Sequence, residues 1–174
     1  MDYTRILNVA KEYVEKHDLR NARFIEWNTI KADYTKKILV EISNEIVENN
    51  EWFKSNLYVD EVKANMKSDS GKLMSSNPMR TVILRSGAIP VLSYTSEDSN
   101  SKRSIVESGF QLHFGPTING KINVLAFGHS IENESEVKKS IKIIDHPKDI
   151  DDEIIIKCII EAFEFFKTTS YLFK

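Results

Sequence analysis

Apolar side chains recur at spacings of three and four in two early segments, a pattern that predicts two amphipathic helices. The first covers about residues 2–18. The second runs from about residue 27 to Asn50, with Asn28 or Thr29 placed to cap its first free amides. The apolar stripes comprise Tyr3, Ile6, Leu7, Ala10, Val14 and His17 in the first helix, and Trp27, Ile30, Tyr34, Ile38, Ile42 and Ile46 in the second.

The segment 50–71 continues with a less regular apolar spacing. Phe53, Leu57, Val62 and Met66 fall on one side of a helix, so the pattern predicts a third helix here. A break near Tyr58 is compatible with the spacing, and the polar residues 68–71 end the segment.

After residue 79 the apolar period falls from about 3.6 to 2, and β-branched and aromatic residues become frequent, which predicts β-strands. Five strands are expected, over residues 80–85, 89–95, 108–114, 121–127 and 140–145. The nine-residue polar run 95–103 between the second and third strands is expected to be a surface loop.

Asn119-Gly120 is a strong hairpin signal, because both residues accept the positive φ of a type I′ turn. With a two-residue turn at this point, Phe114 faces Leu125. That register places His113 and His129 on opposite faces of the hairpin, where they cannot share a metal ion. The interpretation left open is a longer loop over residues 115–120, because Pro116 lacks the amide that a tight ladder needs.

A last helix is predicted over residues 151–168, with acidic residues in its first turn and Lys167 near its end, as the helix dipole favours. Its core-facing arc contains Ile155, Cys158, Ile159, Ala162 and Phe166. Ile156, Ile160 and Phe163 extend the apolar surface beyond the width that one packed layer requires. Three further apolar residues follow in the tail: Tyr171, Leu172 and Phe173.

These six residues, Ile156, Ile160, Phe163, Tyr171, Leu172 and Phe173, are therefore the predicted partner-binding surface. Large apolar patches left in water mark interaction sites. The alternative is that the two N-terminal helices of the same chain cover the last helix on its second side.

The order of elements predicts a single α+β domain over residues 1–174. It has two layers: N-terminal helices and a long C-terminal helix pack on a roughly five-stranded, mainly antiparallel meander. The composition, 41% hydrophobic and 29% charged, is that of an ordered globular chain.

The net charge of −2 gives no field that would attract nucleic acid or an anionic membrane, so neither partner is expected. The single cysteine, Cys158, excludes an internal disulfide and points to a reducing compartment. The chain has no run of 18 apolar residues, and charges interrupt its start, so we expect a cytoplasmic protein.

Sequence signatures of catalysis and of cofactor binding are missing. The chain has no phosphate-binding loop, no zinc-protease motif, no nucleophile elbow and no dinucleotide fingerprint. His113 and His129 each stand alone and are interpreted as structural residues. We therefore expect no catalytic, cofactor-binding or metal-binding residues.

The sequence thus favours a non-catalytic interaction or accessory subunit of a cytoplasmic, bacterial multi-protein system, of which a defence system is one example. Its partner is another protein or a second copy of the chain. The alternative is a small-molecule-binding domain or an unrecognised enzyme, with a pocket between helices and sheet to which Tyr34, Arg85, Tyr94 and His113 contribute polar groups.

Overall fold

The computed structural model describes residues 3–64, 78–95, 102–130 and 137–170. Its helical elements, in chain order, are α1 (Tyr3–Glu26), the π-helical turn η1 (Trp27–Lys31), α2 (Ala32–Asn49), the 3₁₀ turns η2 (Glu51–Phe53) and η3 (Pro147–Asp149), and α3 (Asp152–Thr169). The strands are β1 (Leu57–Ala64), β2 (Met79–Ser86), β3 (Ile89–Thr95), β4 (Lys102–Glu107), β5 (Gln111–Pro116), β6 (Ile122–Phe127) and β7 (Lys138–Ile144).

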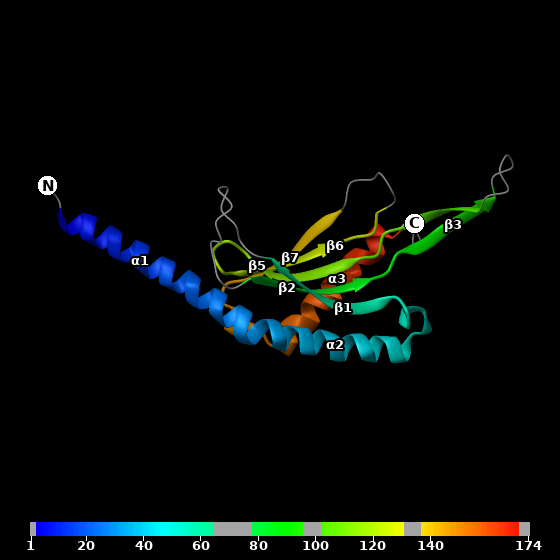
Figure 1. Cartoon of the computed structure of the whole chain (residues 1–174), viewed down its shortest axis with the longest axis horizontal. Helices are drawn as coiled ribbons and strands as arrows, with labels where there is room; N and C mark the ends of the chain where they lie inside the picture. Colours follow the sequence, from blue (N-terminus) through cyan, green and yellow to red (C-terminus); the bar gives the residue numbers. More distant parts are fainter. Residues whose placement is uncertain (1–2, 65–77, 96–101, 131–136, 171–174) are drawn as a thin grey trace.

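Five strands form one antiparallel sheet in the order β1-β2-β5-β6-β7. The strands β3 and β4 pair only with each other and form a separate ribbon, inserted between β2 and β5. In Figure 1 the helices α2 and α3 lie on one side of the sheet, whereas α1 runs away from the body and carries the N-terminus to the far end of the molecule. The predicted α+β class, with N-terminal helices, an antiparallel five-stranded sheet and a C-terminal helix, is confirmed.

The core lies between the sheet and the helices α2 and α3. Its inner sheet face alternates along each strand, as a half-covered sheet requires. The buried side chains on this face are Val82, Leu84, Leu112, Phe114, Ile122, Val124, Ala126 and Ile144. They pack against Ala32 and Leu39 of α2 and Ile155, Cys158, Ile159, Ala162 and Phe166 of α3.

The predicted C-terminal helix is confirmed within one residue at each end. The carboxylate of Asp151 accepts a hydrogen bond from the amide of Ile154 at 2.8 Å and so caps the first turn of α3. Burial raises the pKa of the Cys158 thiol to about 11, so this group stays protonated and unreactive at neutral pH.

The predicted third helix over residues 50–71 is wrong: its first part is the single turn η2 and its middle is the edge strand β1, while residues 65–71 lie outside the described part of the chain. The inner face of β1 carries Leu57, Val59 and Glu61 in alternation. Because the charged Glu61 occupies an inward position, apolar and polar residues do not alternate regularly along β1, and the sequence does not show the period of a strand. Pairing with β2 decides the conformation.

The predicted two-residue hairpin register is also wrong by one position. Phe114 faces Val124, and the strands close at the pair Pro116 and Ile122, so the loop comprises residues 117–121. A one-residue shift moves every side chain of one strand to the other face. In the structure Phe114, Val124 and Ala126 therefore share the buried face, whereas Leu125 and Phe127 lie on the opposite one.

The remaining differences concern element boundaries and membership. The first helix continues to Glu26 and joins α2 through η1, so neither Asn28 nor Thr29 caps a helix start. Lys102 and Arg103, predicted to lie in the polar loop, begin β4, and the strand over residues 89–95 belongs to the ribbon, not to the main sheet.

The β5–β6 loop packs against the C-terminal end of α1 through Gly120, which has a φ of +77°. A Cβ at this position would lie 2.9 Å from the carbonyl oxygen of Arg20 and 2.9 Å from Cβ of Arg23. We predict that Gly120→Ala lowers the free energy of unfolding by about 2 kcal/mol, because it adds left-handed backbone strain and a clash. Urea unfolding measures the change.

Gly87→Ala is the matched control for this substitution, since its Cβ would meet only Asn56 Oδ1 at an ordinary 3.5 Å. A Gly120→Ala protein as stable as the Gly87→Ala protein would show that the loop does not rest on α1 in this way.

Candidate interaction surface

The helix α1 has no buried residue along its length. Its C-terminal end touches the body at Arg23, whose guanidinium lies 3.3 Å and 3.5 Å from the two ring nitrogens of His146, and at the Gly120 contact. Residues 3–19 are all exposed. A helix of this length in water gains most of its stability from packing an apolar face. Among the described residues, none buries the segment 3–19 of α1.

One side of α1 carries most of the large exposed apolar side chains of this helix. Tyr3, Ile6, Leu7, Tyr13 and Val14 have between 54% and 73% of their surface in water. Together with Ala10 and with His17, Asn21 and Phe24 farther along the helix, they form one continuous band, which we call the α1 stripe. A contiguous apolar surface of this kind on a protein marks an interaction site.

The spacing within the α1 stripe is that of a coiled coil. Seven of its positions alternate strictly by four and three residues: Tyr3, Leu7, Ala10, Val14, His17, Asn21 and Phe24. This heptad repeat keeps one narrow seam toward a second helix over many turns, whereas a helix that packs on a sheet shows a broader stripe. The polar His17 and Asn21 within the seam are typical of positions that select a partner and a register.

The partner-binding residues predicted from the sequence lie elsewhere, on α3. Ile156 and Ile160 are exposed, with 45% and 58% of their surface in water. Phe163, one turn farther along, is half-buried. Its ring packs edge-to-face against the rings of Phe53 of η2 and of Phe110, with distances between ring centroids of 6.2 Å and 5.2 Å. Tyr171, Leu172 and Phe173 lie outside the described residues.

Sequence reasoning found most of the α1 stripe but assigned it no binding role. The 3-4 spacing alone does not distinguish a helix that covers its own core from one that binds another chain. The signal that does distinguish them is the strict heptad alternation with His17 and Asn21 on the seam, because polar side chains in these positions suit an interhelical contact better than a sheet surface.

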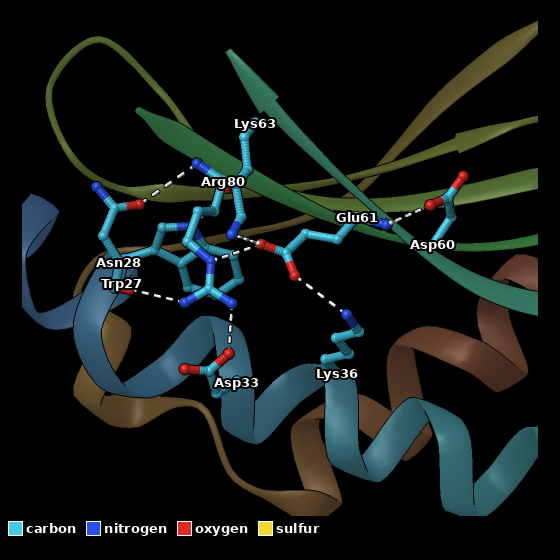
Figure 2. A network of polar contacts seen from close by, with 8 residues as sticks. All are labelled: Trp27, Asn28, Asp33, Lys36, Asp60, Glu61, Lys63 and Arg80. Carbon is cyan, nitrogen blue, oxygen red and sulfur yellow. Dashed lines mark hydrogen bonds and ion pairs between the residues drawn. The ribbon is translucent and has the colours of Figure 1, made fainter. Parts of the chain in front are cut away.

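A cluster of charged groups fastens the α1–α2 junction to the sheet edge (Figure 2). The Arg80 guanidinium of β2 donates to Glu61 Oε1 at 2.7 Å and to the carbonyl of Asn28 at 2.8 Å, and it pairs with Asp33. Lys36 reaches the other oxygen of Glu61 at 3.2 Å. Hydrogen bonding from Arg80 lowers the pKa of Glu61. These side chains are paired with one another and hold the α1–α2 junction against the sheet edge.

A second polar cluster is buried where β4, β6 and α3 end. The Glu107 carboxylate accepts a hydrogen bond from Ser170 Oγ at 3.1 Å and lies 3.7 Å from His129 Nδ1, which is 3.0 Å from the carbonyl of Ser108. Serine, histidine and glutamate thus meet, but the serine donates to the carboxylate, whereas a nucleophilic serine is activated by the imidazole. The cluster ties the ribbon to the helix.

The sheet face turned away from the helices carries a third group of polar side chains. Arg85 pairs with Asp60 at 2.8 Å and lies over the Tyr58 ring at 4.7 Å, and His113 Nε2 is 2.7 Å from Gln111 Oε1. Tyr34 lies on the other side, where it bonds to Asp152 on α3. The residues expected to line one pocket therefore do not converge, and the side chain of Tyr94 lies outside the described part.

Burial, with a smaller contribution from the charge of Arg85, lowers the pKa of His113 below its ordinary value of 6.5. The unfolded chain then binds the proton more readily than the folded one, so the folded state loses stability as the pH falls through about 6.5. We predict that His113→Gln removes this loss: compared with the wild type, the variant gains stability between about pH 8 and about pH 5 in urea titrations. If the stability difference between the two proteins were the same at about pH 8 and at about pH 5, His113 would not be the source of this loss.

No cluster of three or more metal-binding side chains exists within residues 3–64, 78–95, 102–130 and 137–170. In the same part of the chain, no helix is both long enough and apolar enough to span a bilayer. Comparisons of the chain with protein-family models, with curated proteins and with solved structures found no match.

Proposed function

We propose that this chain is a non-catalytic interaction subunit that binds another protein chain through the α1 stripe, as an accessory component of a cytoplasmic assembly. The observation that carries the proposal is the exposure of Tyr3, Ile6, Leu7, Tyr13 and Val14 along one side of a helix that projects from the body (Figure 1). A projecting helix with a heptad seam is suited to pair with another helix.

The energetics support association. Full burial of a large apolar side chain is worth about 1.5–3 kcal/mol, so covering the exposed half of five of them yields roughly 4–8 kcal/mol. A partner buries a comparable apolar area of its own. The sum is large enough to offset an association cost of about 4–15 kcal/mol.

The charge pattern of α1 favours a protein over a lipid surface as the partner. Helices that lie on anionic membranes carry a strongly basic polar face. The polar positions of α1 carry five basic residues, Arg5, Lys11, Lys16, Arg20 and Arg23, and four acidic residues, Glu12, Glu15, Asp18 and Glu26. Such a mixed surface gives no net attraction to lipid head groups, whereas it suits pairing with complementary charges on another helix.

Site-specific photocrosslinking in the native cells tests the proposal. A photoreactive side chain at Leu7, on the stripe, is expected to give a discrete covalent adduct with another protein chain. The matched control is the same group at Glu12, which lies on the opposite side of α1 and is expected to give none. Equal labelling at both positions, or no adduct at Leu7, would refute the function proposed.

A further inference from the structure

We propose that the chain covering the α1 stripe is a second copy of this chain, and that the two α1 helices pair antiparallel in one register. This inference rests on the proposed function and names its partner. In the register, Leu7 of one copy faces Phe24 of the other, Ala10 faces Asn21, and Val14 faces His17, so that the six seam positions from Leu7 to Phe24 are covered.

The heptad geometry determines which side chains flank this seam. With the seven seam positions given above, one flank carries Lys11 and Asp18. The other flank carries Tyr13 and Arg20. In an antiparallel pair, each flank faces the same flank of the other copy. Lys11 and Asp18 therefore meet the Lys11 and Asp18 of the second copy, and the register decides which meets which.

Three antiparallel registers, one heptad apart, keep the two seams in contact. The charged residues on the flanks favour one of the three. In the proposed register, Lys11 of each copy lies beside Asp18 of the other, which gives two opposite-charge pairs. A shift by one heptad in one direction places Lys11 beside Lys11. A shift in the other direction places Asp18 beside Asp18. Like charges held together disfavour both shifted registers.

The same register is favoured by the second flank. It places Tyr13 beside Arg20 of the other copy, a contact between a cation and an aromatic ring. Within its own chain, the Arg20 guanidinium lies 5.5 Å from the centroid of the Phe24 ring. Its Nε is buried and has no hydrogen-bond partner among the described residues. The proposed register leaves only Tyr3 without a facing seam position, one shifted register leaves only Phe24, and the other leaves Tyr3, Leu7 and Ala10, so coverage disfavours the last of these.

A parallel pair of α1 helices would bring no opposite charges together on its flanks. There the flanking contacts join Tyr13 to Asp18, Ile6 to Lys11 and Arg20 to Ile25 of the other copy, and none of them is a pair of opposite charges. The antiparallel arrangement also separates the two bodies, because each one lies at the C-terminal end of its own α1 (Figure 1).

Sedimentation velocity of the full chain and a charge-swap series test the inference. Lys11 and Asp18 are exposed, with 78% and 73% of their side-chain surface in water, so their substitution leaves the fold of the body intact. The wild type is expected to be a dimer. Lys11→Glu and Asp18→Lys each replace two attractive contacts by two repulsive ones, and each is expected to raise the dissociation constant about tenfold at low salt.

The double variant Lys11→Glu/Asp18→Lys restores both opposite-charge pairs and is expected to dimerise like the wild type. A double variant as weak as either single variant would overturn the register. A wild type that stays monomeric at all concentrations would overturn self-association. In that case an adduct at Leu7 with a different protein would leave the proposed function standing, so the two failures are distinguishable.

Cysteine crosslinking reads the orientation directly. In a Cys158→Ser background, Ala10→Cys/Asn21→Cys is expected to form a covalent dimer on oxidation, because positions 10 and 21 face each other between copies. Ala10→Cys alone is expected to remain monomeric in the denatured state, since no position faces itself in this register. A covalent dimer of the single variant, as a parallel pair would give, would overturn the antiparallel arrangement.

Discussion

Replacing Trp27 with alanine is expected to lower the free energy of unfolding by about 4 kcal/mol, the upper range for the loss of a buried aromatic side chain. Trp27 is fully buried at the first residue of η1, and its Nε1 donates to the carbonyl of Arg80 at 2.7 Å. The alanine variant leaves a cavity and an unpaired carbonyl at the point where α1 joins α2. Chemical denaturation followed by circular dichroism measures the loss.

Trp27→Phe is the matched control, because it keeps an aromatic ring in the core and removes the hydrogen bond to Arg80 together with a small part of the ring volume. We expect the phenylalanine variant to lose about 1–2 kcal/mol, the cost of one unsatisfied group and a smaller ring. If Trp27→Ala were no less stable than Trp27→Phe, the side chain would not fill the junction as the structure has it.

Replacing Arg80 with methionine is expected to cost about 3 kcal/mol. Arg80 and Glu61 have only 12% and 10% of their side-chain surface exposed. Removing the guanidinium therefore leaves the largely buried carboxylate of Glu61 with Lys36 and Lys63 as its charged partners. The contact with Asp33, which is 66% exposed, adds little because water screens it. The effect is measured as the change in unfolding free energy at neutral pH.

The pH dependence of this substitution has a definite sign. Arg80 lowers the pKa of Glu61 below its ordinary value of 4.5 in the folded protein. The resulting stabilisation is present above about pH 4.5 and is lost as the pH falls through the lowered pKa. The difference between the wild type and Arg80→Met should therefore shrink in acid.

The double variant Arg80→Met/Glu61→Leu separates the ion pair from simple packing. It removes both charges, so we expect it to recover most of the stability that Arg80→Met loses. No recovery would mean that the guanidinium acts chiefly through the carbonyl of Asn28 and through packing, not through Glu61.

The parts of the fold that the sequence predicted are those with local and periodic signals. The last helix, with its acidic start at Asp151, and the strands β2, β5, β6 and β7 follow directly from helical and alternating patterns. The edge strand β1 could not be predicted in this way, since Glu61 occupies a core-facing position. Its pairing with Arg80 depends on a residue 19 positions away.

The α1 stripe, too, could be predicted from the sequence only in part. The apolar positions of α1 are visible in the sequence, but their exposure depends on where the helix leaves the body. That direction is set by long-range contacts, such as Gly120 against Arg20 and Arg23 against His146, which no local pattern encodes. The surplus apolar surface on α3 was visible as well. The structure leaves Ile156 and Ile160 exposed and partly covers Phe163 with Phe53.

Hydrogen–deuterium exchange of the amides of residues 3–19 tests most directly whether the α1 stripe is covered. For the wild type at concentrations above the dissociation constant of its complex, we predict slow exchange along this segment, because packing of the stripe stabilises the helix. In Leu7→Asp/Val14→Asp we predict fast exchange there and unchanged exchange in the sheet. Equally fast exchange of residues 3–19 in both proteins would contradict a covered stripe.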